Sequence, residues 1–272
     1  MTNQDKKTDE QTIEDFGRQW TEYTENDDYY GSVACLQDIF GPVLNLRKVA
    51  DAQVADIGSG TGRIVNMLLD AGARHVTAIE PSMAMDALVE NTKERANCVD
   101  YIRATGEAVS RCQQLDFVFS IGVLHHIVDP GPIVREAQKA LKPGGHMLVW
   151  LYGKEGNEAY LTIFGPLRAI TKRLPHFLLS FLCTILNAGS DVYILLCRCL
   201  PMPLRRYFLE HLAKLNRHQR HLTIYDQLNP AYAKYYTESE ARSLFEDNGF
   251  IDVRHYHRHG YSWTVIGQKP QN

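Results

Sequence analysis

The sequence lacks most of the patterns expected of a secreted, metal-binding or nucleic-acid-binding protein. Its six cysteines form no Cys-x-x-Cys pair, and no Cys/His group has the spacing of a structural zinc site. There is no Gly-Lys-Ser/Thr sequence, which excludes the phosphate-binding loop of nucleotide hydrolases. A basic excess is also missing, since 29 Lys and Arg face 32 Asp and Glu. We therefore expect reduced thiols, no metal site and no nucleic-acid partner.

Targeting and membrane segments are equally scarce. Residues Met1 to Glu14 are polar and acidic without the apolar core of a signal peptide, so we expect a frayed tail and a cytoplasmic location. One uncharged stretch, Leu174 to Ser190, has 17 residues. A membrane-crossing helix needs roughly 20 apolar residues, so this stretch favours a buried helix or a dimer contact, with a groove for a lipid-like ligand as the alternative.

Between Ala52 and Tyr152, short apolar strands alternate with amphipathic helices, which is typical of a parallel α/β sheet. Expected strands cover 54–57, 75–79, 99–103, 115–120 and 146–152, and expected helices cover 63–71, 83–96 and 133–141. The alternation resumes with a helix over 238–248 and strands near 251–257 and 261–268.

The alternation divides the chain into three parts. Residues 1–49 are expected to form the tail and a helical, aromatic-rich lid. Residues 50–152 and 237–272 form the α/β domain. Residues 153–236 show no strand pattern, and this segment is too long for a structureless loop. We therefore expect a helical cap that mediates dimerisation or binds the molecule on which the protein acts, here called the acceptor.

The first expected strand ends in Asp56-Ile-Gly-Ser-Gly-Thr-Gly62. Glycines here let the backbone turn tightly and approach a ligand at the start of a helix. Glu80 follows the second strand, where a carboxylate can accept hydrogen bonds from both hydroxyls of a ribose. These two features fit either a dinucleotide or an adenosyl compound.

The following segments separate those two ligands. Ala104-Thr-Gly-Glu107 follows the third strand, Asp116 to His126 covers the fourth, and Leu141-Lys-Pro-Gly-Gly145 leads into the fifth. With the first two motifs, this succession resembles the class I S-adenosylmethionine-dependent methyltransferase family over roughly 100 residues. The resemblance implies a Rossmann-like, seven-stranded, mostly parallel sheet with the cap inserted after strand five. It also implies S-adenosylmethionine as cofactor and S-adenosylhomocysteine as product.

The resemblance also assigns expected roles by position. The glycine turn would pass under the methionine part of the cofactor, Glu80 would bind its ribose, and Thr105, which stands where many members carry Asp, would border the adenine. An N-terminal aromatic segment would close over the site. The cofactor-binding residues implied are Trp20, Asp56, Gly58, Ser59, Gly60, Gly62, Glu80, Pro81, Ser82, Thr105, Gly106, Glu107, Ser120, Ile121, Gly122 and Val123.

Methyl transfer is a direct displacement, so a base is needed only if the acceptor loses a proton. His125, His126 and Tyr152 are the candidates for that role, because they follow the carboxyl ends of strands four and five. Side chains of a strand alternate between its two faces, so counting from Val123 favours His125 as the residue that faces the site. The alternating His255, His257 and His259 have no further ligand to complete a metal site, and they are a second candidate wall of the acceptor pocket.

The expected acceptor is a small molecule or a lipid- or glycan-linked molecule. Basic residues between Arg205 and His221 also fit an anionic acceptor or peripheral contact of the cap with a membrane. Two other functions stay open at this point: a nicotinamide-dependent oxidoreductase, and a non-catalytic cofactor-binding protein on the same fold.

Overall fold

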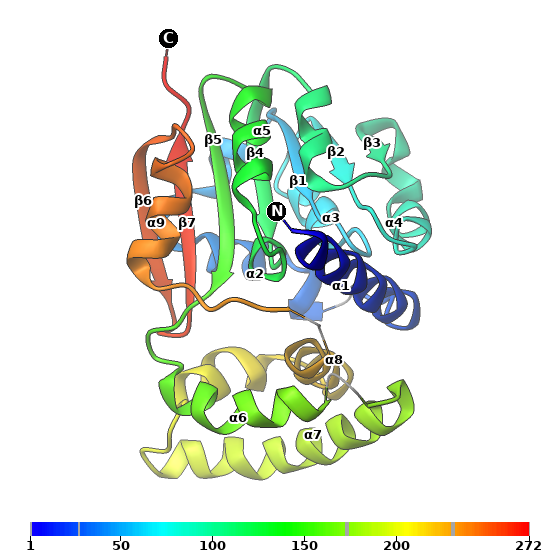
Figure 1. The fold of residues 1–272 in the computed structure, drawn as a ribbon, viewed down its shortest axis with the longest axis vertical. Helices are drawn as coiled ribbons and strands as arrows, with labels where there is room; N and C mark the ends of the chain where they lie inside the picture. Colours follow the sequence, from blue (N-terminus) through cyan, green and yellow to red (C-terminus); the bar gives the residue numbers. More distant parts are fainter. Residues whose placement is uncertain (1, 27, 172–173, 230–231, 272) are drawn as a thin grey trace.

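The computed structural model describes residues 2–26, 28–171, 174–229 and 232–271. Its centre is a seven-stranded sheet in the order β3-β2-β1-β4-β5-β7-β6 (Figure 1). Strand β7 runs antiparallel to both of its neighbours, and the other strands pair in parallel. The predicted seven-stranded, mostly parallel sheet is therefore confirmed. The strands are β1 (Gln53–Ile57), β2 (His75–Ile79), β3 (Val99–Ile102), β4 (Leu115–Ile121), β5 (Leu141–Tyr152), β6 (Ile251–Arg258) and β7 (Ser262–Gln268).

Helices cover both faces of this sheet. Successive strand side chains point to opposite faces, so Phe117 and Phe119 of β4 join one core while Val118 joins the other. The first core contains residues of α2 (Val33–Phe40), α3 (Arg63–Asp70) and α4 (Met85–Thr92). The second contains residues of α5 (Gly131–Ala140) and α9 (Glu238–Glu246). The strand order reverses between β1 and β4, which is where open α/β sheets bind ligands.

The expected N-terminal tail is wrong. Apart from Met1, which lies outside the described residues, the segment belongs to helix α1 (Asn3–Glu22). Thr2 and Asp5 form a capping box at its start. Asp9 accepts a hydrogen bond from the backbone of Val128 at 3.0 Å, so tertiary contacts order a sequence that is polar overall.

One expected boundary also moves. The helix expected over 83–96 is α4 followed by a 3-10 turn at Lys93–Cys98. Strand β5 is assigned from Leu141, but residues 142–145 interrupt its ladder with a register shift and Gly144 has φ +77°, so regular pairing with β4 and β7 begins at His146, as expected.

The region inserted after β5 is helical, as expected. It contains α6 (Glu158–Thr171), α7 (His176–Cys199) and α8 (Arg217–Leu228), with single turns at Tyr207–His211 and Leu212–Lys214. Figure 1 shows these helices gathered beyond one end of the sheet, with α7 outermost. The cap leaves and rejoins the sheet at one place, since Gly153 and Tyr236 form a parallel bridge and the Tyr236 nitrogen donates to the Tyr152 carbonyl at 2.8 Å.

Candidate functional site

The glycine turn after β1 is anchored on the neighbouring strand. The backbone nitrogens of Gly58 and Ser59 donate to the carbonyl of Ile79 at 2.8 and 3.1 Å. Gly58 has φ +75°, and a Cβ there would lie 2.4 Å from a methyl carbon of Val123. Only glycine fits this position, because the backbone is left-handed and the space is already filled.

Glu80 links the ends of β1 and β2. Its two carboxylate oxygens accept hydrogen bonds from the backbone nitrogens of Gly60 and Ser82, each at 2.9 Å. The side chain is buried, yet it lines the cavity described below. Each oxygen of an ionised carboxylate has capacity for a further hydrogen bond. The group is therefore held in place and can still bind a pair of ligand hydroxyls.

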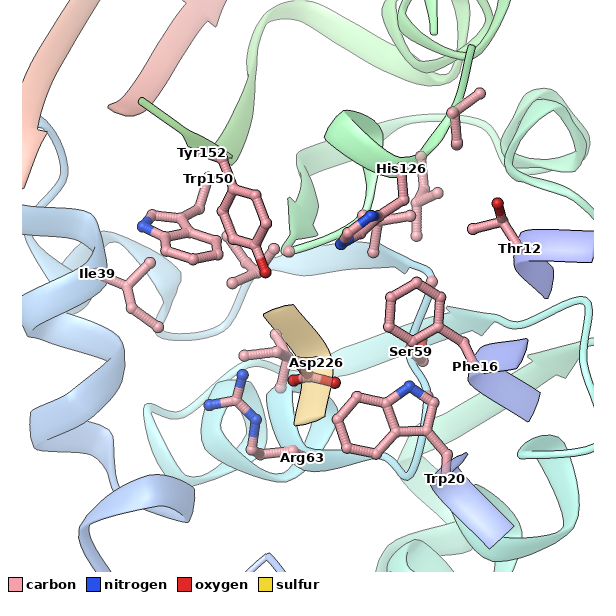
Figure 2. A pocket seen from close by; sticks show the side chains of 18 of the residues that line it. Thr12, Phe16, Trp20, Ile39, Ser59, Arg63, His126, Trp150, Tyr152 and Asp226 are labelled. Atoms are coloured by element: carbon pink, nitrogen blue, oxygen red, sulfur yellow. The ribbon is translucent and has the colours of Figure 1, made fainter. Parts of the chain in front are cut away.

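A cavity of about 300 Å³ runs between the glycine turn and the cap (Figure 2). It has contributions from α1, from the carboxyl ends of the strands and from the cap. Most of the site residues expected from the sequence line it, namely Trp20, Gly58, Ser59, Gly60, Glu80, Pro81, Thr105, Gly106, Glu107, Ile121, Gly122, Val123, His126 and Tyr152.

Five expected residues do not line the cavity. They are Asp56, Gly62, Ser82, Ser120 and His125. Ser120 is buried with its hydroxyl donating to the Ile57 carbonyl at 3.3 Å, so it does not face the cavity as a cofactor-binding residue would. Asp56 lies buried with Oδ2 unpartnered within the described chain, and burial raises its pKa to about 7. Asp56 therefore supports the turn from beneath.

The preference for His125 over His126 is also wrong. His125 is fully buried, and its ring stacks on that of Tyr152 with centroids 3.8 Å apart. His126 lines the cavity instead, and its Nδ1 lies 2.8 Å from the carbonyl oxygen of Tyr232. Residues Leu124–His126 form a 3-10 turn, in which side chains follow a period of three rather than the strand period of two. The strand alternation that favoured His125 ends before this turn.

Buried surroundings set the charges of these groups. Burial lowers the pKa of His126 to about 3, and it lowers the pKa of His125 well below its usual value. Burial also raises the pKa of Tyr152 well above its usual value. At neutral pH the two histidines are therefore uncharged and Tyr152 keeps its phenolic proton.

The cap side of the cavity is aromatic. Rings from α1, the sheet and the cap surround it, and Figure 2 shows Trp150, Tyr152 and His126 facing Trp20 and Phe16 across the space. The aromatic residues on the cap side are Tyr30, Trp150, Tyr152, Tyr160, Tyr207, Tyr235 and Tyr261. Such walls suit a planar or apolar acceptor.

The three alternating histidines near the C-terminus do not line the cavity. His259 lies 2.9 Å from Asp38 and 2.6 Å from Glu210, His257 stacks on Trp263, and His255 lies 3.1 Å from Glu238. Within the described residues no group of three possible ligands could hold a metal ion, so these side chains have structural partners instead.

Comparison with known proteins agrees with this geometry. Residues 55–149 match a family described as a methyltransferase domain. Two solved structures share the fold. The S-adenosylmethionine-dependent methyltransferase SibL has a TM-score of 0.52 and 17% sequence identity, over 87% of this chain and 55% of SibL. An O-methyltransferase family protein from Burkholderia thailandensis has a TM-score of 0.50 and 12% identity, over 84% of this chain and 54% of that protein. Residues 55–149 therefore form a methyltransferase domain of the class I S-adenosylmethionine-dependent type.

Two curated relatives of this chain have names that point to different acceptors. A ubiquinone biosynthesis O-methyltransferase from Bradyrhizobium diazoefficiens is 28% identical over 45% of this chain and 49% of its own length. A tRNA U34 carboxymethyltransferase from Cellvibrio japonicus is 31% identical over 42% of this chain and 37% of its own. The chain thus spans half or less of the length of these relatives, and the cap has no counterpart in the matched family segment.

Sequence reasoning missed several residues that line the cavity. Arg63 directly follows the glycine turn, and Asp226 comes from α8. Asp9 and Ile13 belong to the helix that was expected to be a tail. A signal for that helix does exist, because Ile13, Phe16 and Trp20 follow the three- and four-residue spacing of one helical face. The sequence carries no comparable signal for Asp226.

Proposed function

We propose that this protein transfers the methyl group of S-adenosylmethionine to a small-molecule or lipid- or glycan-linked acceptor bound beneath the cap. The observation that carries this proposal is the continuity of one cavity. It joins Glu80 and the glycine turn to the aromatic chamber around Tyr152. A donor and an acceptor bound in one such space are held close together, which supplies much of the catalysis of a direct displacement.

The residues present fit the cofactor. Glu80 would bind the ribose hydroxyls, because its fixed carboxylate retains acceptor capacity. The turn at Thr105, Gly106 and Glu107 would border the adenine ring, and Pro81 would pack beside it. Trp20 would cover the glycine turn, since its indole nitrogen lies 3.6 Å from the position of a Cβ on Gly60.

When bound, S-adenosylmethionine supplies an electrophilic methyl group on a positively charged sulfur. The chain's own part is to orient the acceptor, exclude water and receive a proton where one is lost. His126 would accept a hydrogen bond from the acceptor through Nε2, because Nδ1 is directed to the Tyr232 carbonyl. Tyr152, which keeps its proton, would act as a hydrogen-bond donor. We assign no proton transfer to His125, which lies outside the cavity.

Thermal-shift and turnover measurements test this function. S-adenosylmethionine and S-adenosylhomocysteine should raise the melting temperature, whereas NADH should not. Stabilisation by NADH alone would instead indicate an oxidoreductase. Transfer of radiolabelled methyl to extracted lipids, phenols or glycans would identify the acceptor class. Cofactor binding without turnover of any acceptor would indicate a non-catalytic binding protein.

We further propose a cytoplasmic location, an acceptor other than nucleic acid, and peripheral contact of the cap with a membrane. The net charge of −3 supports the second of these points. Because one relative acts on tRNA, the acceptor screen should include RNA. Labelled methyl in RNA would contradict the proposal. A homodimer through the cap is the competing arrangement to membrane contact.

A further inference from the structure

Arg63 and Asp226 approach one end of the cavity from different parts of the fold. Arg63 is the first residue of α3, directly after the glycine turn, and Asp226 belongs to α8 of the cap. Figure 2 shows both side chains at the same end of the space, near Trp20 and Ser59. A cation from α3 and an anion from α8 therefore lie at the same end of the cavity.

Neighbouring groups hold both side chains in position. The Gln19 amide donates to Oδ1 of Asp226 across 207 residues of sequence, and Asn229 in turn donates to the Gln19 oxygen at 3.3 Å. The Arg63 guanidinium donates to the Tyr30 carbonyl at 3.1 Å and lies 4.0 Å from the centre of that ring. Neither charge has an ion-pair partner among the residues that the structure describes.

Three of the other charged groups that line the cavity have partners within the described residues. Arg258 bonds Asp38 and the Tyr261 hydroxyl, and Asp9 accepts from Val128. Glu80 is held between two backbone nitrogens at the end of β2. Glu107 belongs to the turn after β3, whereas Arg63 directly follows the glycine turn after β1. Arg63 and Asp226 are thus the charges left for a ligand at the turn.

We infer that Arg63 binds the carboxylate and Asp226 the ammonium of the amino-acid part of the cofactor. This inference rests on the proposed function. A zwitterion carries its carboxylate and its ammonium on one carbon, so a cation and an anion at the same end of the cavity can bind both groups. Burial raises the pKa of Asp226 to about 7, against the Gln19 hydrogen bond and the Arg63 charge. A bound ammonium would favour the ionised carboxylate. The cap then belongs to the cofactor site as well as to the acceptor site.

Calorimetric titration with two ligands tests this. S-adenosylhomocysteine carries the amino-acid part, and 5′-methylthioadenosine lacks it. We expect Asp226→Asn to weaken binding of the first at least tenfold and to change binding of the second less than twofold. Arg63→Met should behave in the same way, which keeps the test usable if one variant fails to fold. Glu246→Gln, on α9, is the matched control, because it also removes one negative charge but lies outside the cavity.

Each outcome separates the two proposals. If the wild-type protein binds neither ligand, the proposed function fails. A second outcome is that the wild-type protein binds S-adenosylhomocysteine while both variants lose the same affinity for the two ligands, or lose no affinity for either. In both cases the proposed function stands, and the assignment of Arg63 and Asp226 to the amino-acid part fails. Asp226 would then belong to the acceptor side, and its substitution would change turnover alone.

Helix α7 carries a second, independent inference, because its large apolar side chains face outward. Phe177 and Phe181 are 70% and 65% exposed. The other exposed large apolar residues on this helix are Leu178, Ile185, Val192, Leu195 and Leu196. They recur every three or four residues and form one uncharged stripe along the helix. A contiguous exposed stripe of this kind marks an interaction surface.

The opposite face of α7 packs on α8, where Leu179 and Cys183 join Tyr225 and Leu228 in one buried cluster, and polar contacts add to this packing. Asn187 donates to the Arg217 carbonyl at 2.7 Å, and Asp191 pairs with Arg217 and Arg220 at 2.6 and 2.7 Å. Within the described chain, Phe177–Cys199 is the one helix long and apolar enough to cross a membrane. These polar contacts hold it along the cap instead, as the outermost helix in Figure 1.

We propose that this stripe docks on an anionic lipid surface. Arg198 and Arg206 are exposed near the carboxyl end of α7, and neither has an ion-pair partner within the described residues. An apolar stripe bordered by cations matches the acyl and headgroup layers of an anionic membrane. A symmetric dimer would use the apolar stripe without using these charges.

Vesicle co-sedimentation tests the docking. The full chain should pellet with vesicles of phosphatidylglycerol and phosphatidylcholine, and at least fivefold less with phosphatidylcholine alone. Replacing Phe177, Phe181 and Ile185 by serine should abolish pelleting. In the control, Met83 and Val89 are replaced by serine; both are exposed apolar residues, the first just before α4 and the second on it. A dimer in light scattering that the triple variant loses, with no vesicle binding by the wild type, would overturn the proposal.

Discussion

The carboxylate of Glu80 accepts a hydrogen bond from the backbone nitrogen of Gly60 at 2.9 Å, and this bond ties the end of β2 to the turn after β1. The same carboxylate would bind the cofactor ribose. A group that is already held in place loses little freedom when a ligand arrives, which favours tight binding.

Glu80→Gln should therefore weaken binding of S-adenosylhomocysteine by roughly 10- to 100-fold. Loss of charge-assisted hydrogen bonds typically costs about 1.5–3 kcal/mol. Titration calorimetry measures the change, and Glu90→Gln, on the exposed side of α4, is the control. Equal affinities in the wild type and Glu80→Gln would remove Glu80 from the ribose site.

Gly58→Ala should lower the melting temperature by about 5–10 °C, which corresponds to roughly 3 kcal/mol for a chain of this size. A Cβ at φ +75° is strained, and it would also lie 2.4 Å from the Val123 side chain. Adding Val123→Ala should recover part of the loss, because it removes the clash and leaves the strain. Calorimetric melting of both variants decides this, and no recovery in the double variant would mean that the clash contributes nothing.

His126→Ala should reduce kcat by roughly tenfold, because it removes the hydrogen bond that holds the acceptor, and one such bond typically contributes about 0.5–1.5 kcal/mol. His125→Phe should keep kcat within threefold, since that ring stacks on Tyr152 outside the cavity. Steady-state kinetics on the acceptor found in the screen separates the two residues. The reverse pattern would restore His125 as the reacting group.

Affinity for S-adenosylhomocysteine should depend on pH through Asp226. The pKa of the free carboxyl is about 7, and an ammonium partner lowers it in the complex. Binding therefore requires the deprotonated form, so affinity stays constant above pH 7 and falls by roughly tenfold per unit below it. Asp226→Asn should flatten this dependence. Asp56 also has a pKa of about 7, so a dependence that persists in the variant would point to Asp56 instead.

Asp38→Asn should destabilise the protein by about 3–5 kcal/mol at pH 7, because it leaves the buried Arg258 unpaired. Although burial opposes it, the His259 hydrogen bond and the Arg258 charge hold the pKa of Asp38 well below its usual value. A depressed pKa contributes stability above the unfolded value of about 3.9, and this is lost as pH falls further. Denaturant unfolding should show the gap between variant and wild type shrinking below pH 4. Asp86→Asn, at an exposed ion pair, should cost less than about 1 kcal/mol.

The sequence predicted the half of the site that local patterns encode. Gly58, Glu80 and Thr105 each follow a strand, and the carboxyl ends of neighbouring parallel strands must meet at one edge. The contacts from the cap could not be predicted, because Asp226 reaches the glycine turn only through the folding of three helices. Helix α1 was missed because its many charges resemble a solvated tail. His125 was preferred to His126 because a single 3-10 turn changes the side-chain period.

The bridge between Gly153 and Tyr236 has an evolutionary consequence. Because the inserted helices depart and return through adjacent backbone, the intervening module is exchangeable: another loop or domain can replace it while the sheet hydrogen bonds persist. If Asp226 contributes to donor recognition, however, such an exchange is not neutral. A replacement segment that changes which acceptor is bound must also supply an acidic group near Arg63. A change of acceptor would otherwise weaken binding of the methyl donor.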